Sequence, residues 1–272
     1  MKKLAKLTLV LALAFAMAFT FAACGGGSSS EDAASSAAAS GSAAGSGLTA
    51  TDGELHMATN AAFPPYEMTT DDGGFEGIDV EIATEIAKKL GLELVVDDMD
   101  FSSVLTAVQG GKSDIAMAGL TVTDERKKNV DFTDTYAKGV QSIIVSEDSD
   151  IKGPDDLKGK KIGCQEGTTG YIYCADDFGE ENVNSYTNGA IAVQALVGGK
   201  VDAVVIDNNP AKEFVKANKG LVLLDTAYAE EDYAIGVSKD NPELTKAVNT
   251  ALKELKEDGT VDKIIEKYIK AE

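Results

Sequence analysis

Arg126 is the residue best placed, by its type and its neighbours, to bind a small anion. It follows the run Gly-Leu-Thr-Val-Thr at 119–123 and falls in the first turn of an expected helix, whose N-cap is Thr123 or Asp124. A helix N-terminus offers free N–H donors, and a guanidinium binds a carboxylate through two parallel hydrogen bonds. An arginine opposes the helix dipole at this end, so a compensating anion is expected. The alternative is an arginine exposed on a charged surface.

Asp207 has the chemistry to bind the opposite charge. It closes the apolar run Ala-Val-Val-Ile at 203–206, and a carboxylate at the end of such a strand is costly unless it is paired. The ammonium group of a ligand would pair it. Together, Arg126 and Asp207 would hold a zwitterion.

Two loops that follow predicted strands carry polar and aromatic groups. The loop 60–67 presents Asn60 and Phe63, and its two prolines make it rigid. The glycine-containing loop 163–170 joins a strand to a helix and offers the hydroxyl and amide donors of Thr168 and Thr169. This second loop resembles a phosphate-binding loop only weakly, because it lacks the Gly-Lys-Ser/Thr ending.

The composition of the 272-residue chain excludes several other partners. With 25 Lys and Arg against 45 Asp and Glu, the net charge is -20, which repels nucleic-acid backbones and anionic lipid headgroups. One His and three Cys leave little for a zinc site. We therefore expect no nucleic-acid partner, no metal and no cofactor.

The candidate residues need a scaffold in which strands and helices alternate. Apolar patterning predicts strands at 55–59, 92–96 and 115–118, and helices at 79–90 and 102–109. The two helices are expected to end at Gly91 and at Gly110-Gly111. The stretch 242–271 has helical apolar stripes and should break at Gly259. Alternation of this kind indicates an α/β fold with mostly parallel sheets flanked by helices.

An internal repeat suggests that there are two such units. Residues 101–119 read FSSVLTAVQGGKSDIAMAG, and residues 189–207 read GAIAVQALVGGKVDAVVID. Each predicts a helix, a Gly-Gly end and a buried strand, although chance similarity is the alternative. Ligands bind outside the carboxyl ends of strands in open α/β sheets, so two facing lobes would share one cleft.

Residues 1–23 have the pattern of a secretory signal, with Lys2, Lys3 and Lys6 before an uncharged apolar run. The run ends in Phe-Ala-Ala before Cys24, which resembles the bacterial lipobox, where the cysteine is lipidated and the chain is cut just before it. An uncleaved anchor and a plain signal peptide are the alternatives. Residues 24–50 are rich in Gly, Ser and Ala and cannot bury enough apolar area to fold, which predicts a disordered tether and a globular part from about Thr51.

The region from about Glu54 to Tyr268 resembles the solute-binding proteins of amino-acid ABC transporters, which have the type 2 periplasmic-binding-protein fold. The resemblance is carried by the segments ATNAAFPPYEM, GFEGIDVEIATEIAKKLG, MDFSSVLTAVQGGKSDIAMAGLTVTDERKKNVDFTDTY, KIGCQEGTTG and VDAVVID. It implies two α/β lobes, 51–140 with 229–272 and 141–228. A two-strand hinge would join them, with crossovers near 138–141 and 228–233.

The same resemblance implies a function and partners. The chain would be a monomeric extracytoplasmic receptor that closes on a free amino acid and delivers it to the permease subunits of an ABC transporter for import. A lipid anchor on Cys24 would hold it at the membrane, on the outer face of a single-membrane bacterium rather than in a periplasm.

The resemblance also assigns roles to ten positions of this sequence. Arg126 would bind the α-carboxylate of the ligand, and Asp207 would bind its α-ammonium. In binding the carboxylate, Arg126 would be supported by Gly119, Thr121, Thr168 and Thr169. The side chain of the ligand would lie between Phe63 and Phe101, with Asn60 and Gln165 near its tip.

Two departures from the family pattern concern ligand choice. Some relatives have Asp where this chain has Asn60, and some have a second polar residue where it has Ile206. Two facing phenyl rings suit a cationic side chain and stack equally on an amide. We expect a polar or basic amino acid, with arginine or lysine slightly ahead of glutamine.

Three other residues have alternatives. Cys164 and Cys174 are either a disulfide, which export permits, or two buried thiols. His56 lies between Leu55 and Met57 on a strand, so it should point away from their face as a solvated side chain.

The main alternative to a receptor is an exported enzyme on the same fold, similar to a dehydratase. Its acid and base would come from Glu67, Glu166 or Asp207, but the chain shows no Ser-His-Asp, Cys-His or metal set. We therefore expect no enzyme. A ligand-sensing module is a third possibility, and it would need a transmembrane helix and a signalling domain.

Overall fold

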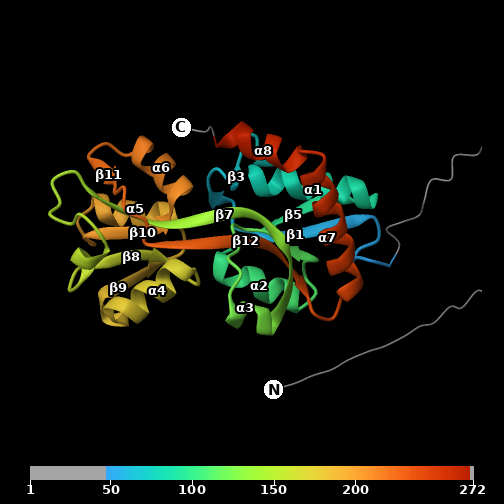
Figure 1. The fold of residues 1–272 in the computed structure, drawn as a ribbon, viewed down its shortest axis with the longest axis horizontal. Helices are drawn as coiled ribbons and strands as arrows, with labels where there is room; N and C mark the ends of the chain where they lie inside the picture. Colours follow the sequence, from blue (N-terminus) through green and yellow to red (C-terminus); the bar gives the residue numbers. More distant parts are fainter. Residues whose placement is uncertain (1–46, 270–272) are drawn as a thin grey trace, which may run out of the picture. The chain divides into compact units, whose positions relative to one another are not determined.

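The structure is a computed structural model that describes residues 47–269 (Figure 1). Its first part alternates as predicted, in the order β1 (Glu54–Thr59), β2 (Ala62–Phe63), β3 (Glu67–Thr69), β4 (Phe75–Glu76), α1 (Ile78–Leu90), β5 (Glu93–Asp98), α2 (Phe101–Gln109), β6 (Ile115–Ala116) and α3 (Asp124–Asn129). The expected strands and helices of this part are confirmed to within two residues at each end.

The long strand β7 (Val130–Ser146) leads into a second group of elements. In order, these are the 3₁₀ helix η1 (Pro154–Leu157), β8 (Ile162–Gln165), α4 (Thr169–Phe178), the 3₁₀ helix η2 (Glu180–Asn182), β9 (Val183–Tyr186), α5 (Gly189–Val197), β10 (Ala203–Asp207), α6 (Asn208–Ala217) and β11 (Leu221–Leu223). Strand β12 (Ala229–Ser238) then returns to the first group, and α7 (Pro242–Glu257) and α8 (Thr260–Tyr268) end it on either side of Gly259, as expected.

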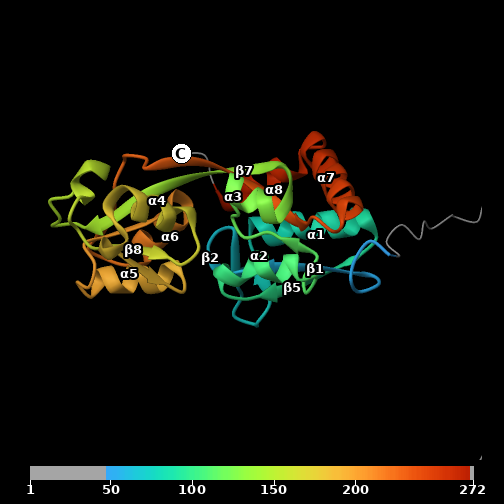
Figure 2. The same cartoon turned by 90° about the horizontal axis from the view of Figure 1, so that it is seen from below.

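Two lobes are joined by the long strands β7 and β12, which run antiparallel to each other (Figure 1). The strand order is β5-β1-β6-β12-β7-β10-β8-β9, with β11 added on β7. In the first lobe β1 pairs in parallel with β5 and β6, and in the second lobe β8 pairs in parallel with β9 and β10. Figure 2 shows α4, α5 and α6 at one end of the long strands and α1, α2 and α7 at the other.

Each parallel sheet is buried on both faces. In the first lobe Leu55 and Met57 of β1 pack with α1, α7 and α8, while Ala58 packs with α2. In the second lobe Val205 of β10 packs in the cluster that contains α4, and Val204 packs in the cluster that contains α5 and α6. Side chains alternate between the faces of a strand, so one apolar run serves two cores.

The internal repeat is a structural repeat. Both copies end a helix at a glycine and continue through a glycine with positive φ, Gly111 at 67° and Gly199 at 66°. The spacing shared by the two copies also places an aspartate immediately before each repeat strand, Asp114 before β6 and Asp202 before β10. Asp114 exchanges two hydrogen bonds with the backbone of His56, each 2.8 Å long, and Asp202 exchanges two with the backbone of Lys161, each 2.7 Å long. Each aspartate therefore ties the repeat strand to the first strand of its own lobe.

The packed chain begins earlier than the expected Thr51. The backbone carbonyl of Leu48 accepts a hydrogen bond from Nδ2 of Asn241 at 2.8 Å, and Ala50 N donates to Asp114 at 2.9 Å. The side chain of Leu48 packs against the first-lobe core, which explains why an apolar residue interrupts the Gly/Ser/Ala stretch. The predicted signal segment 1–23, Cys24 and the tether up to residue 46 lie outside the described residues. Within residues 47–269, none of the helices is long and apolar enough to span a membrane.

Both remaining cysteines are buried in the second-lobe core. Cys164 lies at 0% exposure on β8 and Cys174 at 0% on α4, and both are free thiols. Of the two alternatives, the structure has the unbridged one.

His56 is paired rather than solvated, contrary to expectation. Its Nε2 lies 3.0 Å from Glu54 and its Nδ1 lies 3.2 Å from Asp97, and its side chain is only 21% exposed. The prediction that it points away from Leu55 and Met57 is correct, but that face of β1 is covered too, by α2, which packs on Ala58, and by the side chain of Asp97 from β5.

Replacing His56 with glutamine is expected to remove a pH-dependent part of the stability. Burial opposes the charged ring, but hydrogen bonds with Glu54 and Asp97 outweigh it and raise the pKa of His56 above 6.5. Such a contribution is complete below the unfolded pKa and is lost as pH rises through the folded value. Relative to His56→Gln, the free energy of unfolding of the wild type should fall by about 0.5 kcal/mol between about pH 5.5 and about pH 8.5. Solvent screening of the partly exposed ring keeps this change small. Urea unfolding at both pH values measures it, and a difference that does not change with pH would contradict it.

Candidate ligand-binding site

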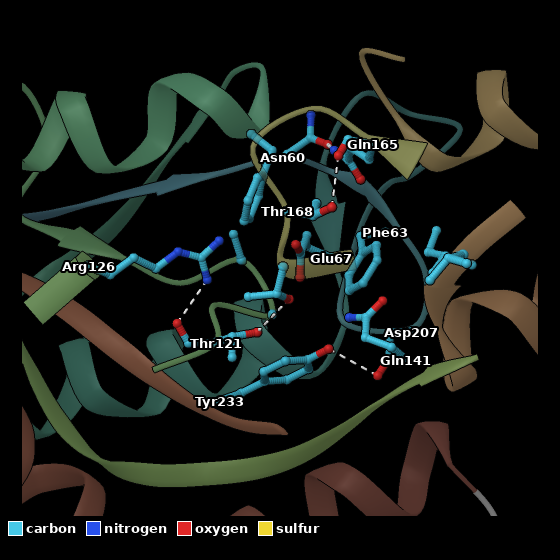
Figure 3. A pocket seen from close by; sticks show the side chains of 16 residues that line it. Asn60, Phe63, Glu67, Thr121, Arg126, Gln141, Gln165, Thr168, Asp207 and Tyr233 are labelled. Atoms are coloured by element: carbon cyan, nitrogen blue, oxygen red, sulfur yellow. Dashed lines mark hydrogen bonds between the residues drawn. The ribbon is translucent and has the colours of Figure 1, made fainter. Parts of the chain in front are cut away.

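A pocket with an empty volume of about 450 Å³ lies where the strand ends of the two lobes meet (Figure 3). The ten predicted positions all line it: Asn60, Phe63, Phe101, Gly119, Thr121, Arg126, Gln165, Thr168, Thr169 and Asp207. Six further residues complete the lining: Glu67, Ala118, Gln141, Val205, Ile206 and Tyr233. The repeat strands β6 and β10 both lead into this pocket, as the fold argument expects.

Arg126 is held in the pocket by its own loop and by the opposite lobe. Thr123 is the N-cap of α3, and its Oγ1 accepts from Arg126 N at 3.1 Å. The guanidinium donates from Nη1 to the carbonyl of Thr121 at 2.8 Å and from Nη2 to the carbonyl of Gly167 at 3.1 Å. Its Cζ lies 5.5 Å from the centre of the Phe101 ring. The exposed-surface alternative is wrong, because Arg126 is 8% exposed.

The N-terminus of α4 adds uncharged donors to this end of the pocket. Thr168 is its N-cap and accepts from Tyr171 N at 3.2 Å, while its hydroxyl donates to the carbonyl of Gln165 at 2.8 Å. Thr169, the first helical residue, is buried with its Oγ1 3.4 Å from that of Thr121. Hydroxyl groups, helix N–H groups and an arginine together suit a carboxylate.

Asp207 stands in the same pocket and is 1% exposed. Its Oδ2 accepts from Val140 N at 2.9 Å and from the hydroxyl of Tyr233 at 3.0 Å, and its Oδ1 accepts from Asn209 N at 3.0 Å. Burial raises the pKa of Asp207 to about 6, although these three hydrogen bonds oppose the rise. The three donors are neutral, so the negative charge has no cation among them and suits an ammonium group.

The remaining predicted residues form the walls and the rim. Gln165 Nε2 donates to Asn60 Oδ1 at 2.9 Å, which joins the two lobes, and Asn60 Nδ2 donates to the carbonyl of Met99 at 2.8 Å. Gly119 has a φ of 54°, and a Cβ there would lie 2.8 Å from the ring of Phe63. Only glycine fits both the backbone conformation and the close approach of that ring.

Gln141, Tyr233 and Glu67 line the pocket but were not predicted as ligand residues. Gln141 and Tyr233 belong to the two expected crossovers, where β7 pairs with β12, and that position was the available signal. Glu67 was considered only as an acid or base. Of the three carboxylates considered for catalysis, Glu67 and Asp207 line the pocket, whereas Glu166 is exposed and does not.

The arrangement can hold a small zwitterion. Arg126 and the start of α4 present positive charge and donors, Asp207 presents a negative charge, and Phe63 and Phe101 offer aromatic surface. No group of three or more metal-ligating side chains occurs among the residues that the structure describes.

Comparisons with known proteins agree with this interpretation. The sequence model of a family described as "Bacterial extracellular solute-binding proteins, family 3" matches residues 55–271. The "Arginine-binding extracellular protein ArtP" of Bacillus subtilis (strain 168) is 34% identical over 269 residues, covering 97% of this chain and 98% of that protein. The "ABC transporter glutamine-binding protein GlnH" of the same organism is 36% identical over 202 residues, 73% of this chain and 74% of that one. A solved "ancestral arginine-binding protein bound to arginine" has a TM-score of 0.75 and 43% identity, covering 80% of this chain and 98% of that one.

Proposed function

The chain belongs to the family 3 bacterial extracellular solute-binding proteins, and on this premise we propose that it is a receptor for a free amino acid. It binds the amino acid in the pocket between its lobes and delivers it to the permease of an ABC transporter for import. The observation that carries the proposal is the presence of buried Arg126 and buried Asp207 in one pocket. These two charges match the two charges of an amino acid.

Within this proposal, Arg126 binds the α-carboxylate and Asp207 binds the α-ammonium. Gly119, Thr121, Thr168 and Thr169 support the carboxylate, and Asn60 and Gln165 lie near the tip of the ligand side chain. A basic side chain is slightly favoured over that of glutamine. Phe63 and Phe101 suit a cation, and relatives named for arginine and for glutamine are similar over most of their length.

Binding is coupled to closure of lobe 51–140 plus 229–272 on lobe 141–228. The contacts that join the lobes around the pocket include Arg126 with the carbonyl of Gly167, Gln165 with Asn60, and Asn209 Nδ2 with the hydroxyl of Tyr66 at 2.9 Å. A ligand that touches both lobes favours the closed state by its differential contacts, and the permease then recognises that state.

The remaining parts of the proposal concern partners and location. The receptor is a monomer, needs no cofactor and is held by a lipid on Cys24 at the outer face of a single-membrane bacterium, with residues 24–46 as its tether. Relatives described as extracellular solute-binding proteins support an extracytoplasmic location.

We propose binding without chemical change. An exported dehydratase-like enzyme is the second candidate, because Glu67 and Asp207, two possible acids or bases, both line the pocket. The two functions differ in what leaves the pocket: a receptor returns its amino acid unaltered. Chromatography of the ligand after prolonged incubation with the protein separates them.

A thermal-shift screen of the twenty amino acids, ornithine and cystine tests the receptor proposal. A ligand at 100 times its Kd adds about 2.7 kcal/mol of stability, which for a chain of this size raises Tm by about 5–10 °C. We expect the largest shift with arginine or lysine and a smaller one with glutamine. The absence of a shift with every compound would contradict the proposal, and loss of the shift in Arg126→Ala would locate it to this pocket.

A further inference from the structure

Glu67 is a buried carboxyl group without a hydrogen-bond donor. It begins β3, lines the pocket and is fully buried, yet neither Oε1 nor Oε2 accepts an N–H or O–H from the described residues (Figure 3). An ionised carboxylate in that position would lack every interaction that normally compensates for lost water. Its charge state therefore needs an explanation.

Asp79 supplies the group that faces it. Asp79 lies in the first turn of α1 and is fully buried, and its backbone N–H donates to the carbonyl of Tyr66, the residue before Glu67, at 2.9 Å. Of the charges that act on Glu67, that of Asp79 is the strongest. Its Oδ2 accepts from Gly119 N at 2.8 Å and from the hydroxyl of Tyr136 at 2.7 Å, whereas its Oδ1 has no N–H or O–H donor. Three of the four carboxyl oxygens of the two residues are thus without a donor.

A single proton resolves the arrangement. Two facing carboxylates repel strongly where water is excluded, and one proton between them removes the second charge and supplies the missing hydrogen bond. Two donors already point at Oδ2 of Asp79, which suits an ionised Asp79 with its free Oδ1 as the acceptor. The proton then belongs to Glu67.

The electrostatic surroundings act in the same direction. Burial raises the pKa of Glu67 well above its ordinary value, and the charges of Asp79, Asp207 and Asp98 add to the rise. Burial also raises the pKa of Asp79 to about 7, against hydrogen bonds from Gly119, Tyr136 and Glu67. The titratable groups that act on the pair are Asp98 from β5, Asp207 from β10, Tyr136 from β7 and the neighbouring Tyr66. Burial lowers the pKa of Arg126, the guanidinium in the pocket, and Glu231 is the strongest of the charges that oppose this.

We propose that Glu67 is a positioning residue whose protonated carboxyl group donates to Oδ1 of Asp79. The hydrogen bond keeps the Asp79 carboxylate on the backbone N–H of Gly119, and Gly119 is the residue that packs against Phe63 in the pocket wall. The series of hydrogen bonds Glu67–Asp79–Gly119 therefore links the proton on Glu67 to the shape of the pocket. Loss of the proton would place two charges behind Gly119 and loosen that wall.

The pH dependence of unfolding tests the shared proton without any ligand. A raised folded-state pKa makes stability fall as pH rises above the unfolded pKa of glutamate, about 4.3, until the folded protein also loses the proton. Glu67→Gln keeps a donor for Asp79 but has no proton to lose. We expect the folding equilibrium constant of the wild type to fall relative to that of Glu67→Gln by up to tenfold per pH unit across this range.

The control is Glu76→Gln on the neighbouring strand β4, where the side chain is exposed; its stability should follow the wild type at each pH. Parallel wild-type and Glu67→Gln curves would overturn the proposal. Infrared spectroscopy of the ligand-free protein at neutral pH gives a second measurement, because a protonated carboxylic acid has its own carbonyl band. That band should be stronger in the wild type than in Glu67→Gln, because Asp79, with a pKa of about 7, contributes to both spectra. Bands of equal strength in the two proteins would also overturn the proposal.

The positioning role rests on the proposed amino-acid receptor and needs a binding measurement. Glu67→Leu removes the donor at similar volume and should weaken binding about tenfold, whereas Glu67→Gln restores the donor and should recover most of the affinity. As pH rises, the wild type should lose affinity more steeply than Glu67→Gln, in which the loss comes only from the ammonium group of the ligand. Equal losses in both variants, or equal pH profiles of Glu67→Gln and wild type, would overturn the role. If no amino acid binds at all, the receptor proposal fails while the ligand-free experiments still decide the shared proton.

Discussion

Replacing Arg126 with alanine is expected to weaken amino-acid binding on the order of a thousandfold. The guanidinium is 8% exposed, and carbonyl groups of both lobes hold it. In the variant, the α-carboxylate of a bound ligand would be buried with its main charge partner removed. Breaking a buried charge pair by removing one partner costs about 3–5 kcal/mol, and each 1.4 kcal/mol is a factor of ten. Isothermal titration calorimetry of the purified chain without residues 1–23 measures the change.

Arg126→Lys separates the effect of charge from that of geometry at this position, and Lys127→Ala is the control. Arg126→Lys keeps the positive charge but loses the planar fork, so its affinity should lie between those of the wild type and Arg126→Ala. Lys127→Ala removes an exposed cation from the same helix and should bind as the wild type does. Binding by Arg126→Ala with the affinity of the wild type would refute the assignment of this end of the pocket.

Asp207→Asn should weaken binding by about a hundredfold or more, by leaving the buried α-ammonium of the ligand unpaired. Asparagine is chosen because Asp207 is also the N-cap of α6, where its Oδ1 accepts from Asn209 N, and asparagine caps equally well. The substitution therefore removes the charge while keeping the helix start. Asp232→Asn is the control, since Asp232 is exposed and paired with Lys138 at 3.5 Å on the long strands.

The pH dependence of binding should distinguish the role of Asp207 from that of the other pocket residues. Its pKa of about 6 in the free protein means that the carboxylate gains a proton as pH falls through that value. A neutral Asp207 has no charge to pair with an ammonium, so wild-type affinity should fall by up to tenfold per pH unit below about 6. The affinity of Asp207→Asn should not change with pH in this range. If the affinity of the wild type does not fall as pH decreases below about 6, the role of Asp207 is contradicted.

Local patterns in the sequence predicted the two charged ends of the site. Asp207 ends the apolar strand of one copy of the repeat, Arg126 follows the strand of the other copy, and the ends of such strands converge in an α/β fold. Local signals of this kind predict the folded structure well because helix caps and helix ends depend on neighbouring residues. Thr123 caps α3, and Gly91 ends α1 with a left-handed conformation, both as expected.

Other features depend on residues far apart in the chain. Glu67 meets Asp79 because a hairpin folds onto the start of α1. Gln141 meets Glu231 at 2.9 Å because β7 pairs with β12 in the register that places Gln141 opposite Ala229. Neither contact leaves a local pattern. His56 was misjudged for the same reason: the alternation of its strand predicts which face it occupies but says nothing about what covers that face.

The pairing of β7 with β12 also determines how the molecule responds to a mechanical load. Val130 pairs with Ser238 at one end of the ladder, and Gln141 pairs with Ala229 at the other. A pull on the two ends of the chain enters both strands at the Val130–Ser238 end, so the ladder opens one residue pair at a time rather than shearing along its length. Residues 142–228 begin and end next to the last pair. They are therefore shielded from tension until the whole ladder has unzipped.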